Sequence, residues 1–222
     1  MSETERWTAQ WCWIKKHLSR PWNTYVCFRN AFHLNDEPSR AVVRVSADAR
    51  YTLYVNGVRV HQGPARSFPD KQSFDTLDLR DLLRAGDNAI CAIVHQFGVP
   101  TAQSAYRDAT GFLLDGRVET NGGSVDLHTP IAWLCREAGG WRKHVARLSP
   151  DLGFQEHFDA DADPPDWLLP EYQATPEAGW RAPVVVAPVG GHPWVSMQSR
   201  GVPLLADELV PFAAIVGQFG GE

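Results

Sequence analysis

The chain has 222 residues, of which 44% are apolar and 21% are charged. This length and composition supply enough apolar surface for a sizeable core, so they exclude a disordered tail and a disulfide-stapled miniprotein. The 21 basic and 26 acidic residues give a net charge of −5. That balance argues against the broad positive face that a phosphate backbone requires, and we expect no nucleic-acid partner.

Strand patterns dominate the first half of the chain. Residues 25–34 and 41–47 are rich in β-branched and aromatic side chains with partial alternation, which predicts two strands. Two further strand-like runs flank Asn56-Gly57, a pair that tolerates the positive φ angles of a type I′ turn, so a β-hairpin is expected there. More strand-like segments lie at residues 73–79, 89–97, 111–119, 125–129, 131–135 and 180–187. The Gly, Pro, Asn and Asp residues between them are typical of an antiparallel β-sandwich.

Helix is predicted in one short place, and the last third of the chain is irregular. Residues 79–85, closed by Gly86, have the pattern of a helical connector about two turns long. Residues 151–175 crowd Asp, Pro and Trp together, and their aromatic side chains need a surface to cover, so an ordered surface excursion is expected. We predict one β-sandwich accessory domain over residues 1–198, and an exit segment over 199–222 that leads toward a missing downstream module.

The apolar runs and the cysteines indicate the compartment. No run approaches the ~18–20 apolar residues that cross hydrocarbon, and the N-terminus lacks the pattern of a signal peptide. The cysteines are widely spaced, without a C-x-x-C pair or a histidine in metal-ligand register, so zinc is not expected. Each cysteine lies in an apolar or alternating run, which favours a reduced, buried thiol. We therefore expect a cytoplasmic protein without a membrane partner.

Five stretches in the first hundred residues carry a family resemblance. They are Phe28-Arg29-Asn30-Ala31-Phe32, the run from Ser46 to Gly57 that contains Tyr51-Thr52-Leu53-Tyr54-Val55-Asn56-Gly57, Gly63-Pro64-Ala65-Arg66, Phe74-Asp75-Thr76-Leu77-Asp78-Leu79 and Leu83-Arg84-Ala85-Gly86-Asp87-Asn88-Ala89-Ile90. In this order they resemble the N-terminal β-sandwich of bacterial α-L-rhamnosidase-like glycoside hydrolases, a jelly roll of the galactose-binding type. Weaker likeness continues over nearly the whole chain. Related sandwiches occur in β-galactosidases and β-glucuronidases, so the resemblance defines the fold more narrowly than the substrate.

The resemblance implies an all-β jelly-roll sandwich that is a non-catalytic N-terminal accessory or carbohydrate-binding domain. Such a domain positions the substrate or the catalytic barrel of the parent enzyme. In this family the catalytic carboxylates lie in a downstream helical barrel, and this sequence has no helix-rich segment of that kind, so the chain is not expected to be active alone. The implied partners are a rhamnoside- or galactoside-like carbohydrate and the downstream catalytic domain. The alternative is a purely structural interdomain docking module without sugar affinity.

One dense acidic stretch lies within the predicted excursion. Its members are Glu156, Asp159, Asp161, Asp163 and Asp166. Glycoside hydrolysis needs two carboxylates about 5–9.5 Å apart, and this spacing on a proline-rich segment predicts no such shared geometry. We interpret the stretch as a solvated loop, with a structural calcium ion as the alternative. No catalytic residue and no other cofactor are predicted.

A polar ligand site is predicted at one end of the sandwich. Residues 63–70 form a loop of the kind that carries binding groups in such folds, and Arg66 in this loop offers a planar fork to a hydroxyl pair or a carboxylate. Asp48, Asp70 and Asp75 are expected to orient the Arg66 guanidinium on the ligand. A salt bridge from Arg66 to Asp48, Asp70 or Asp75, pinning the loop, is the alternative.

Tryptophan is the other candidate for sugar contact, because an aromatic ring offers flat apolar area. Trp167 and Trp194 have prolines nearby and are expected to form a surface pair that contacts a sugar or another domain. Five tryptophans are expected to serve the core: Trp11, Trp13, Trp133, Trp141 and Trp180. His95, near the end of a predicted strand, is expected to be a satisfied structural residue.

Overall fold

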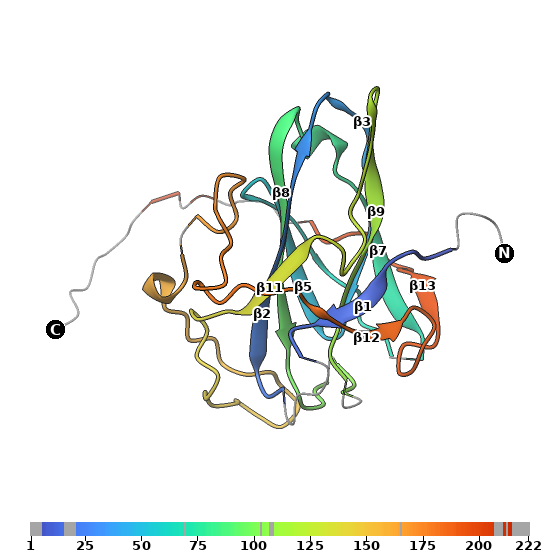
Figure 1. The fold of residues 1–222 in the computed structure, drawn as a ribbon. Helices are drawn as coiled ribbons and strands as arrows, with labels where there is room; N and C mark the ends of the chain where they lie inside the picture. The colour runs from blue at the N-terminus through green and yellow to red at the C-terminus, as the bar shows by residue number, and fades with distance from the viewer. Residues whose placement is uncertain are drawn as a thin grey trace.

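The computed structural model describes residues 6–15, 21–68, 70–102, 104–106, 109–164, 166–206, 211 and 213–214. Two β-sheets pack face to face (Figure 1). Within the described residues, helix is confined to the 3-10 turns Arg80–Leu82 and Ala160–Ala162. The predicted all-β sandwich is therefore confirmed.

The first sheet has five antiparallel strands in the order β11-β2-β8-β5-β6. These strands are β11 (Trp133–Glu137), β2 (Thr24–Leu34), β8 (Gly86–Gln96), β5 (Arg50–Val55) and β6 (Val58–Gly63). The long β2–β8 pair runs in unbroken register from Thr24 opposite Gln96 to Leu34 opposite Gly86. One face of this pair turns to the core and the other turns outward, as period two requires.

The second sheet has the strand order β12-β1-β9-β4-β7-β13, and two short strands also pair with β9. The path consists of β12 (Val184–Pro188), β1 (Gln10–Trp13), β9 (Phe112–Thr120), β4 (Val42–Ala47), β7 (Gln72–Asp78) and β13 (Met197–Ser199). The two added strands are β3 (Pro38–Arg40) and β10 (Gly123–Asp126). β13 pairs with β7 in parallel, so a strand near residue 198 lies beside a strand from the first half of the sequence.

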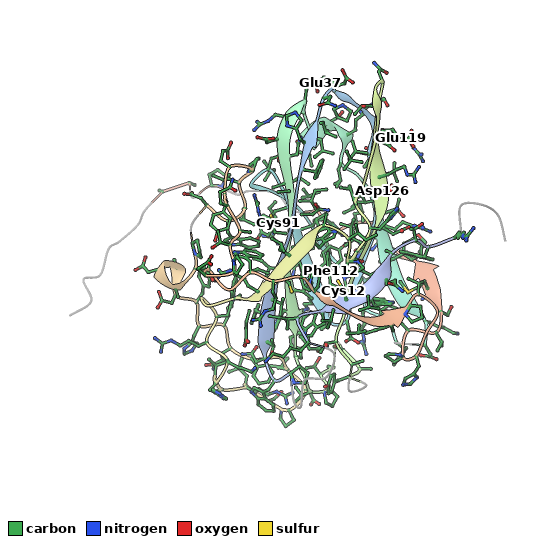
Figure 2. All side chains as sticks on the ribbon, viewed as in Figure 1. Cys12, Glu37, Cys91, Phe112, Glu119 and Asp126 are labelled. Carbon is green, nitrogen blue, oxygen red and sulfur yellow. The ribbon has the colours of Figure 1, made fainter. Side chains whose placement is uncertain are left out.

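The main core lies between the two sheets. Phe112 is fully buried, and its ring centroid lies 4.7 Å from that of Phe28 and 5.4 Å from that of Trp133. Phe112 and Cys12 lie among the interior side chains in Figure 2, whereas Glu37 and Glu119 lie at the far tip of the sandwich. Burial of each large apolar side chain stabilises the fold by roughly 1.5–3 kcal/mol. All four cysteines are buried free thiols, as predicted.

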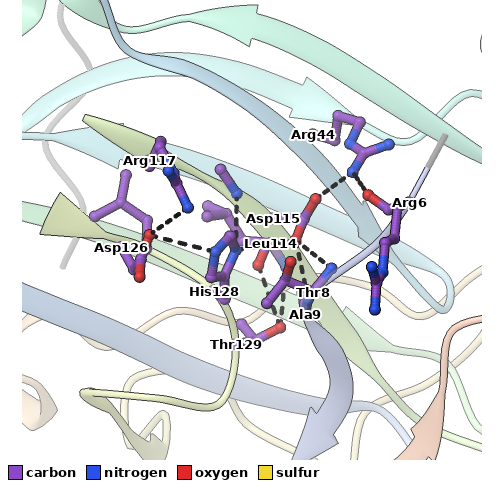
Figure 3. A network of polar contacts seen from close by, with 12 residues as sticks. Arg6, Thr8, Ala9, Arg44, Leu114, Asp115, Arg117, Asp126, His128 and Thr129 are labelled. Atoms are coloured by element: carbon purple, nitrogen blue, oxygen red, sulfur yellow. Dashed lines mark hydrogen bonds and ion pairs between the residues drawn. The ribbon is translucent and has the colours of Figure 1, made fainter. Parts of the chain in front are cut away.

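A polar network holds the N-terminal segment against the second sheet (Figure 3). The Asp115 carboxylate accepts hydrogen bonds from the backbone N–H groups of Thr8 at 3.0 Å and Ala9 at 2.9 Å. It also forms an ion pair with Arg44, and Nδ1 of His128 lies 2.9 Å from one of its oxygens. A nearly buried carboxylate needs this many donors, because an unpaired buried charge is costly. The network therefore positions β1 at the start of the sandwich.

The predicted helix over 79–85 is wrong in type and length. The chain forms the single 3-10 turn Arg80–Leu82 and then enters β8 at Gly86. The Asn88 side chain explains this, because its amide group accepts from the N–H of Arg84 at 3.1 Å and donates to the carbonyl of Arg84 at 2.7 Å. Such side-chain bonds compete with helical hydrogen bonds and end the turn.

The irregular segment before β12 covers the outward face of the five-stranded sheet (Figure 1). Trp167 and Trp180 pack there against Cys27 and Cys91 in a second buried cluster. Tyr172 packs against the same cluster, whereas Phe158 is 53% exposed. Residues 207–210, 212 and 215–222 of the predicted exit segment lie outside the described residues. In the described part of the chain, no helix is long and apolar enough to cross a membrane.

The hairpin between β5 and β6 turns at Asn56-Gly57, as predicted, with φ angles of 50° and 83°. Nδ2 of Asn56 donates to the carbonyl of Leu82 at 2.9 Å, and its Oδ1 accepts from the N–H of Ala89 at 2.8 Å. The turn is therefore tied to the neighbouring strand β8.

We expect Gly57→Val to lower the free energy of unfolding by about 1–3 kcal/mol, because a β-branched residue holds positive φ at a cost. A Cβ at this position also meets Cδ2 of Leu169 at 2.7 Å. Urea denaturation measures the change, and Gly201→Val, at a position with open space around it, is the control. An unchanged midpoint in Gly57→Val would show that the turn is slack.

Candidate functional site

A cleft of about 530 Å³ lies on the outward face of the five-stranded sheet. Its floor consists of outward side chains of β2, β5 and β8, which include Tyr25, Thr52 and Ile93. Its opposite wall is formed by the loop over residues 148–156. The volume lies within the range of about 300–1,000 Å³ that is typical of small-molecule sites.

Aromatic rings line much of this cleft. The ring of Tyr25 stacks on His95 with centroids 3.8 Å apart, and on Trp141 with centroids 4.8 Å apart. Nε1 of Trp141 donates a hydrogen bond to Glu156 at 2.8 Å. Tyr54 and Phe154 also line the cleft, and both are partly exposed. The stack fixes the rings in place, and their accessible parts present apolar area beside polar atoms.

His95 is uncharged at neutral pH. Burial, followed by the nearby Arg50 cation, lowers the pKa of His95 to about 3. Its Nε2 lies 2.8 Å from Oδ1 of Asn23, an acceptor, so this nitrogen carries the proton. The amide group of Asn23 in turn donates to the carbonyls of Arg142 and Lys143. His95 is thus the satisfied structural residue that was expected, and it links the cleft floor to the loop that follows Trp141.

Charged groups of both signs surround the stack. Arg50 and Arg59 line the sheet side, whereas Asp151 and Glu156 line the loop side. The Arg50 guanidinium lies 5.2 Å from the ring centroid of Phe97, within cation–π range. Burial, reinforced by the Glu156 charge, raises the pKa of Tyr25 above its ordinary value, so this phenol stays neutral. The cleft therefore combines apolar rings, neutral donors and charges of both signs.

A second hollow of about 570 Å³ lies at the end of the sandwich, where the sequence predicted a site. Gly63, Pro64 and Arg66 line one side of it, and residues 200–205 line the other. Arg50, Gln62 and Phe97 line both this hollow and the aromatic cleft. The two depressions are therefore neighbours that share a border.

The structure places Arg66 in this end hollow but does not pair it with the predicted carboxylates. Arg66 is exposed, and no described residue forms a hydrogen bond or ion pair with its guanidinium. The Asp48 carboxylate instead accepts from Nε2 of Gln96 and from Nε1 of Trp194, each at 3.1 Å. Burial raises the pKa of Asp48 to about 6. Asp48 does line a small pocket together with Arg66, so the two residues are close without being bonded.

Asp75 is fully buried and has its own partners. One of its oxygens forms an ion pair with Nε of Arg200 at 2.8 Å, and the other accepts from the Tyr51 hydroxyl. Nε2 of His61 lies 3.5 Å from the same carboxylate. The expected orientation of Arg66 by Asp48, Asp70 and Asp75, and the alternative salt bridge, are both wrong. The buried Asp48 and Asp75 take buried donors instead, and the exposed Asp70 does not pair with Arg66.

The expectation that Trp167 and Trp194 form a surface pair is also wrong. They are 5% and 1% exposed. Trp194 stacks on Trp11 with centroids 4.2 Å apart, and Trp167 packs under the excursion near Trp180. Each belongs to a separate buried cluster, so a nearby proline does not mark exposure here. Trp141, expected in the core, is the partly exposed tryptophan that lines the cleft.

The acidic stretch divides into an anchor and exposed side chains. Asp163 is buried, forms an ion pair with Arg136, and accepts from the N–H groups of Gly139 at 2.9 Å and Gly140 at 2.8 Å. Glu156 is exposed and holds Trp141. The solvated-loop interpretation therefore fails for Asp163. Among the described residues, no three His, Cys, Asp or Glu side chains come together in a group that could hold a metal ion.

No family model matches the sequence, and no curated protein matches it. Among solved structures, a GH78 rhamnosidase of Bacillus sp. GL1 is 32% identical, with a TM-score of 0.79, over 90% of this chain and 20% of that chain. An α-L-rhamnosidase from Dictyoglumus thermophilum is 18% identical, with a TM-score of 0.67, over 89% of this chain and 22% of that one. A lectin of Pleurotus ostreatus is 17% identical, with a TM-score of 0.54, over 85% of this chain and 44% of that one. The chain is also similar to a structure of lectin from Pleurotus ostreatus in complex with GalNAc, at 18% identity and a TM-score of 0.53.

The fold thus defines an all-β sandwich domain of a type that is also found in a lectin. More narrowly, the chain resembles a single domain of the GH78 α-L-rhamnosidases, as its motifs predicted. It spans about a fifth of the length of those enzymes. The likenesses below 25% identity show the fold alone.

The buried His95 predicts a pH dependence of stability. Its folded pKa of about 3 lies below its ordinary 6.5, so the unfolded chain takes up the proton first as pH falls. Stability is therefore lost below pH 6.5, by about 2 kcal/mol between pH 7 and pH 5. We expect His95→Gln to lose less unfolding free energy than the wild type between pH 7 and pH 5, by about this amount. Urea denaturation at both pH values measures the difference. His157→Gln, which changes an exposed histidine, is the control. An equal loss in wild type and His95→Gln would contradict the assignment.

Proposed function

We propose that this chain is a non-catalytic accessory domain of an α-L-rhamnosidase-like glycoside hydrolase, and that it binds carbohydrate in the aromatic cleft. In the parent enzyme it positions the substrate or the catalytic barrel. The jelly-roll topology, the cytoplasmic location and the division into a domain over 1–198 and an exit segment over 199–222 are parts of the same proposal. The partners it implies are a rhamnoside- or galactoside-like sugar and the downstream catalytic domain.

The observation that carries the proposal is the composition of the cleft. Sugars combine apolar C–H faces with many hydroxyl groups, and their binding sites answer with aromatic area beside hydrogen-bonding groups. The partly exposed Trp141, Tyr54 and Phe154 provide the rings, and Thr52, Gln62 and Glu156 provide the polar atoms. The resemblance to rhamnosidase domains and to a lectin fold supports the same class of ligand.

Binding is testable with L-rhamnose and galactose. A single neutral sugar that contacts so few groups should bind with a dissociation constant around a millimolar, or about −4 kcal/mol. We expect Trp141→Ala to weaken binding roughly tenfold in an NMR titration, because the ring supplies most of the apolar contact. Trp7→Ala, on the other sheet, is the control and should leave the affinity unchanged. Shifts that persist in Trp141→Ala would place the site elsewhere.

The chain should also be catalytically inert. The carboxylates Asp151 and Glu156 that line the cleft are exposed, and Glu156 accepts a hydrogen bond from the Trp141 indole. Glycoside hydrolysis needs two carboxyl groups that flank the scissile bond, and we do not expect these two to do so. We expect no hydrolysis of chromogenic rhamnosides or galactosides above the buffer rate. Turnover that disappears in Glu156→Gln would overturn the accessory role.

A docking module without sugar affinity is the second candidate, and one observation favours it. Val202, Leu204 and Leu205 are all exposed on the segment after β13, at 58%, 47% and 60%. A run of exposed apolar side chains is typical of a surface that packs on another domain. Failure of rhamnose and galactose to move any resonance at tens of millimolar would favour this candidate.

A further inference from the structure

We propose that the end hollow and the aromatic cleft form one groove for an acidic oligosaccharide, in which Arg66 binds the carboxylate of a uronic-acid unit. This inference rests on the proposed carbohydrate-binding function and names the ligand class. It assigns a separate role to each depression. The cleft provides aromatic contact, and the hollow selects charge.

The charge of the end hollow carries the first step. Three arginines line it, Arg50, Arg66 and Arg200, and no acidic residue of the described part of the chain does. The chain as a whole has a net charge of −5, so this local excess of positive charge runs against the overall balance. The Arg200 charge is compensated from below by the buried Asp75 carboxylate. The exposed Arg66 therefore presents a cation to a ligand in the hollow, and an anion is its complementary partner.

The second argument concerns Arg66, whose backbone lies in a fixed loop and whose side chain is exposed. Just after it, Oγ of Ser67 accepts a hydrogen bond from the N–H of Ser73 at 3.0 Å, which ties the loop to β7. Before it, Gly63 lies so close to Asp75 that a Cβ would meet the carboxylate at 2.0 Å. The loop thus follows a fixed path, and the guanidinium has no described partner. An arginine fork matches a carboxylate with two parallel hydrogen bonds.

The shared border carries the third step. Arg50, Gln62 and Phe97 line both depressions, which measure about 530 and 570 Å³. Each volume is typical of a whole small-molecule site, so the pair accommodates more than one sugar unit. Val202, Pro203 and Leu205 form the apolar side of the hollow and are available to the C–H face of a ring. A sugar chain can therefore lie across the border, with its acidic unit beside Arg66.

The test compares galacturonate with its methyl ester, which has nearly the same shape and no charge. We expect galacturonate to bind about fivefold more tightly at low salt, and the difference to shrink as salt is raised. Arg66→Gln should abolish the difference, whereas Arg66→Lys should retain part of it. Arg117→Gln is the matched control, because Arg117 is an exposed arginine that pairs with Asp126 on the other sheet.

Continuity of the groove has its own readout. A trimer of galacturonate should shift both the indole N–H resonance of Trp141 and the side-chain N–H resonances of Arg66, whereas galacturonate alone should shift mainly the latter. Equal affinity for galacturonate and its ester, or a preference that survives in Arg66→Gln, overturns the inference. If neutral sugars still bind and this binding depends on Trp141, the proposed carbohydrate-binding function stands although the inference about an acidic unit fails. If neither charged nor neutral sugars bind, both fail.

Discussion

The buried guanidinium of Arg29 is the interaction on which the outward face of the five-stranded sheet depends. It is 2% exposed, and it donates to the carbonyls of Trp167 at 3.0 Å, Pro170 at 3.1 Å and Tyr172 at 3.0 Å. Those carbonyls belong to a segment without regular structure, so they have no ladder partners and need donors from elsewhere. A buried charge is tolerated when it is fully bonded. The Arg29 side chain on β2 therefore supplies the hydrogen-bond donors that these carbonyls need, and the carbonyls in turn satisfy the buried guanidinium.

The cleft follows from this kind of anchoring. The chain that leads to the wall loop over 148–156 starts after Gly140. There Asp163 holds the chain through its ion pair with Arg136 and by accepting two backbone N–H groups. Asn23 then connects the start of β2 to the carbonyls that follow Trp141. Because each anchor reaches from a strand to an irregular segment, the rigidity of the sheet extends to the loops. The aromatic stack gains a fixed geometry on which a ligand face can be recognised.

The sequence indicates what is local and misses what depends on distant partners. The Asn56-Gly57 turn and the alternation in β4 and β5 are encoded within a few residues, and all of them are confirmed. The Asp48–Trp194 hydrogen bond joins residues 146 positions apart, so no local pattern announces it. Alternation tells which side chains of a strand face outward, but it does not tell whether another segment covers them. For that reason Tyr25 and Trp141 were not recognised as neighbours.

The ion pair between Arg200 and Asp75 connects the candidate ligand surface to the course of the chain. Arg200 follows β13 directly, lines the end hollow, and is held from below by a fully buried carboxylate. The exposed Val202 and Leu205 come just after it and line the same hollow. A sugar chain in this hollow and a neighbouring domain packed on this strip would therefore cover the same atoms. The proposed carbohydrate binding and the alternative interdomain docking would consequently compete for one surface, and a ligand that occupied it would alter how the chain after β13 contacts its surroundings.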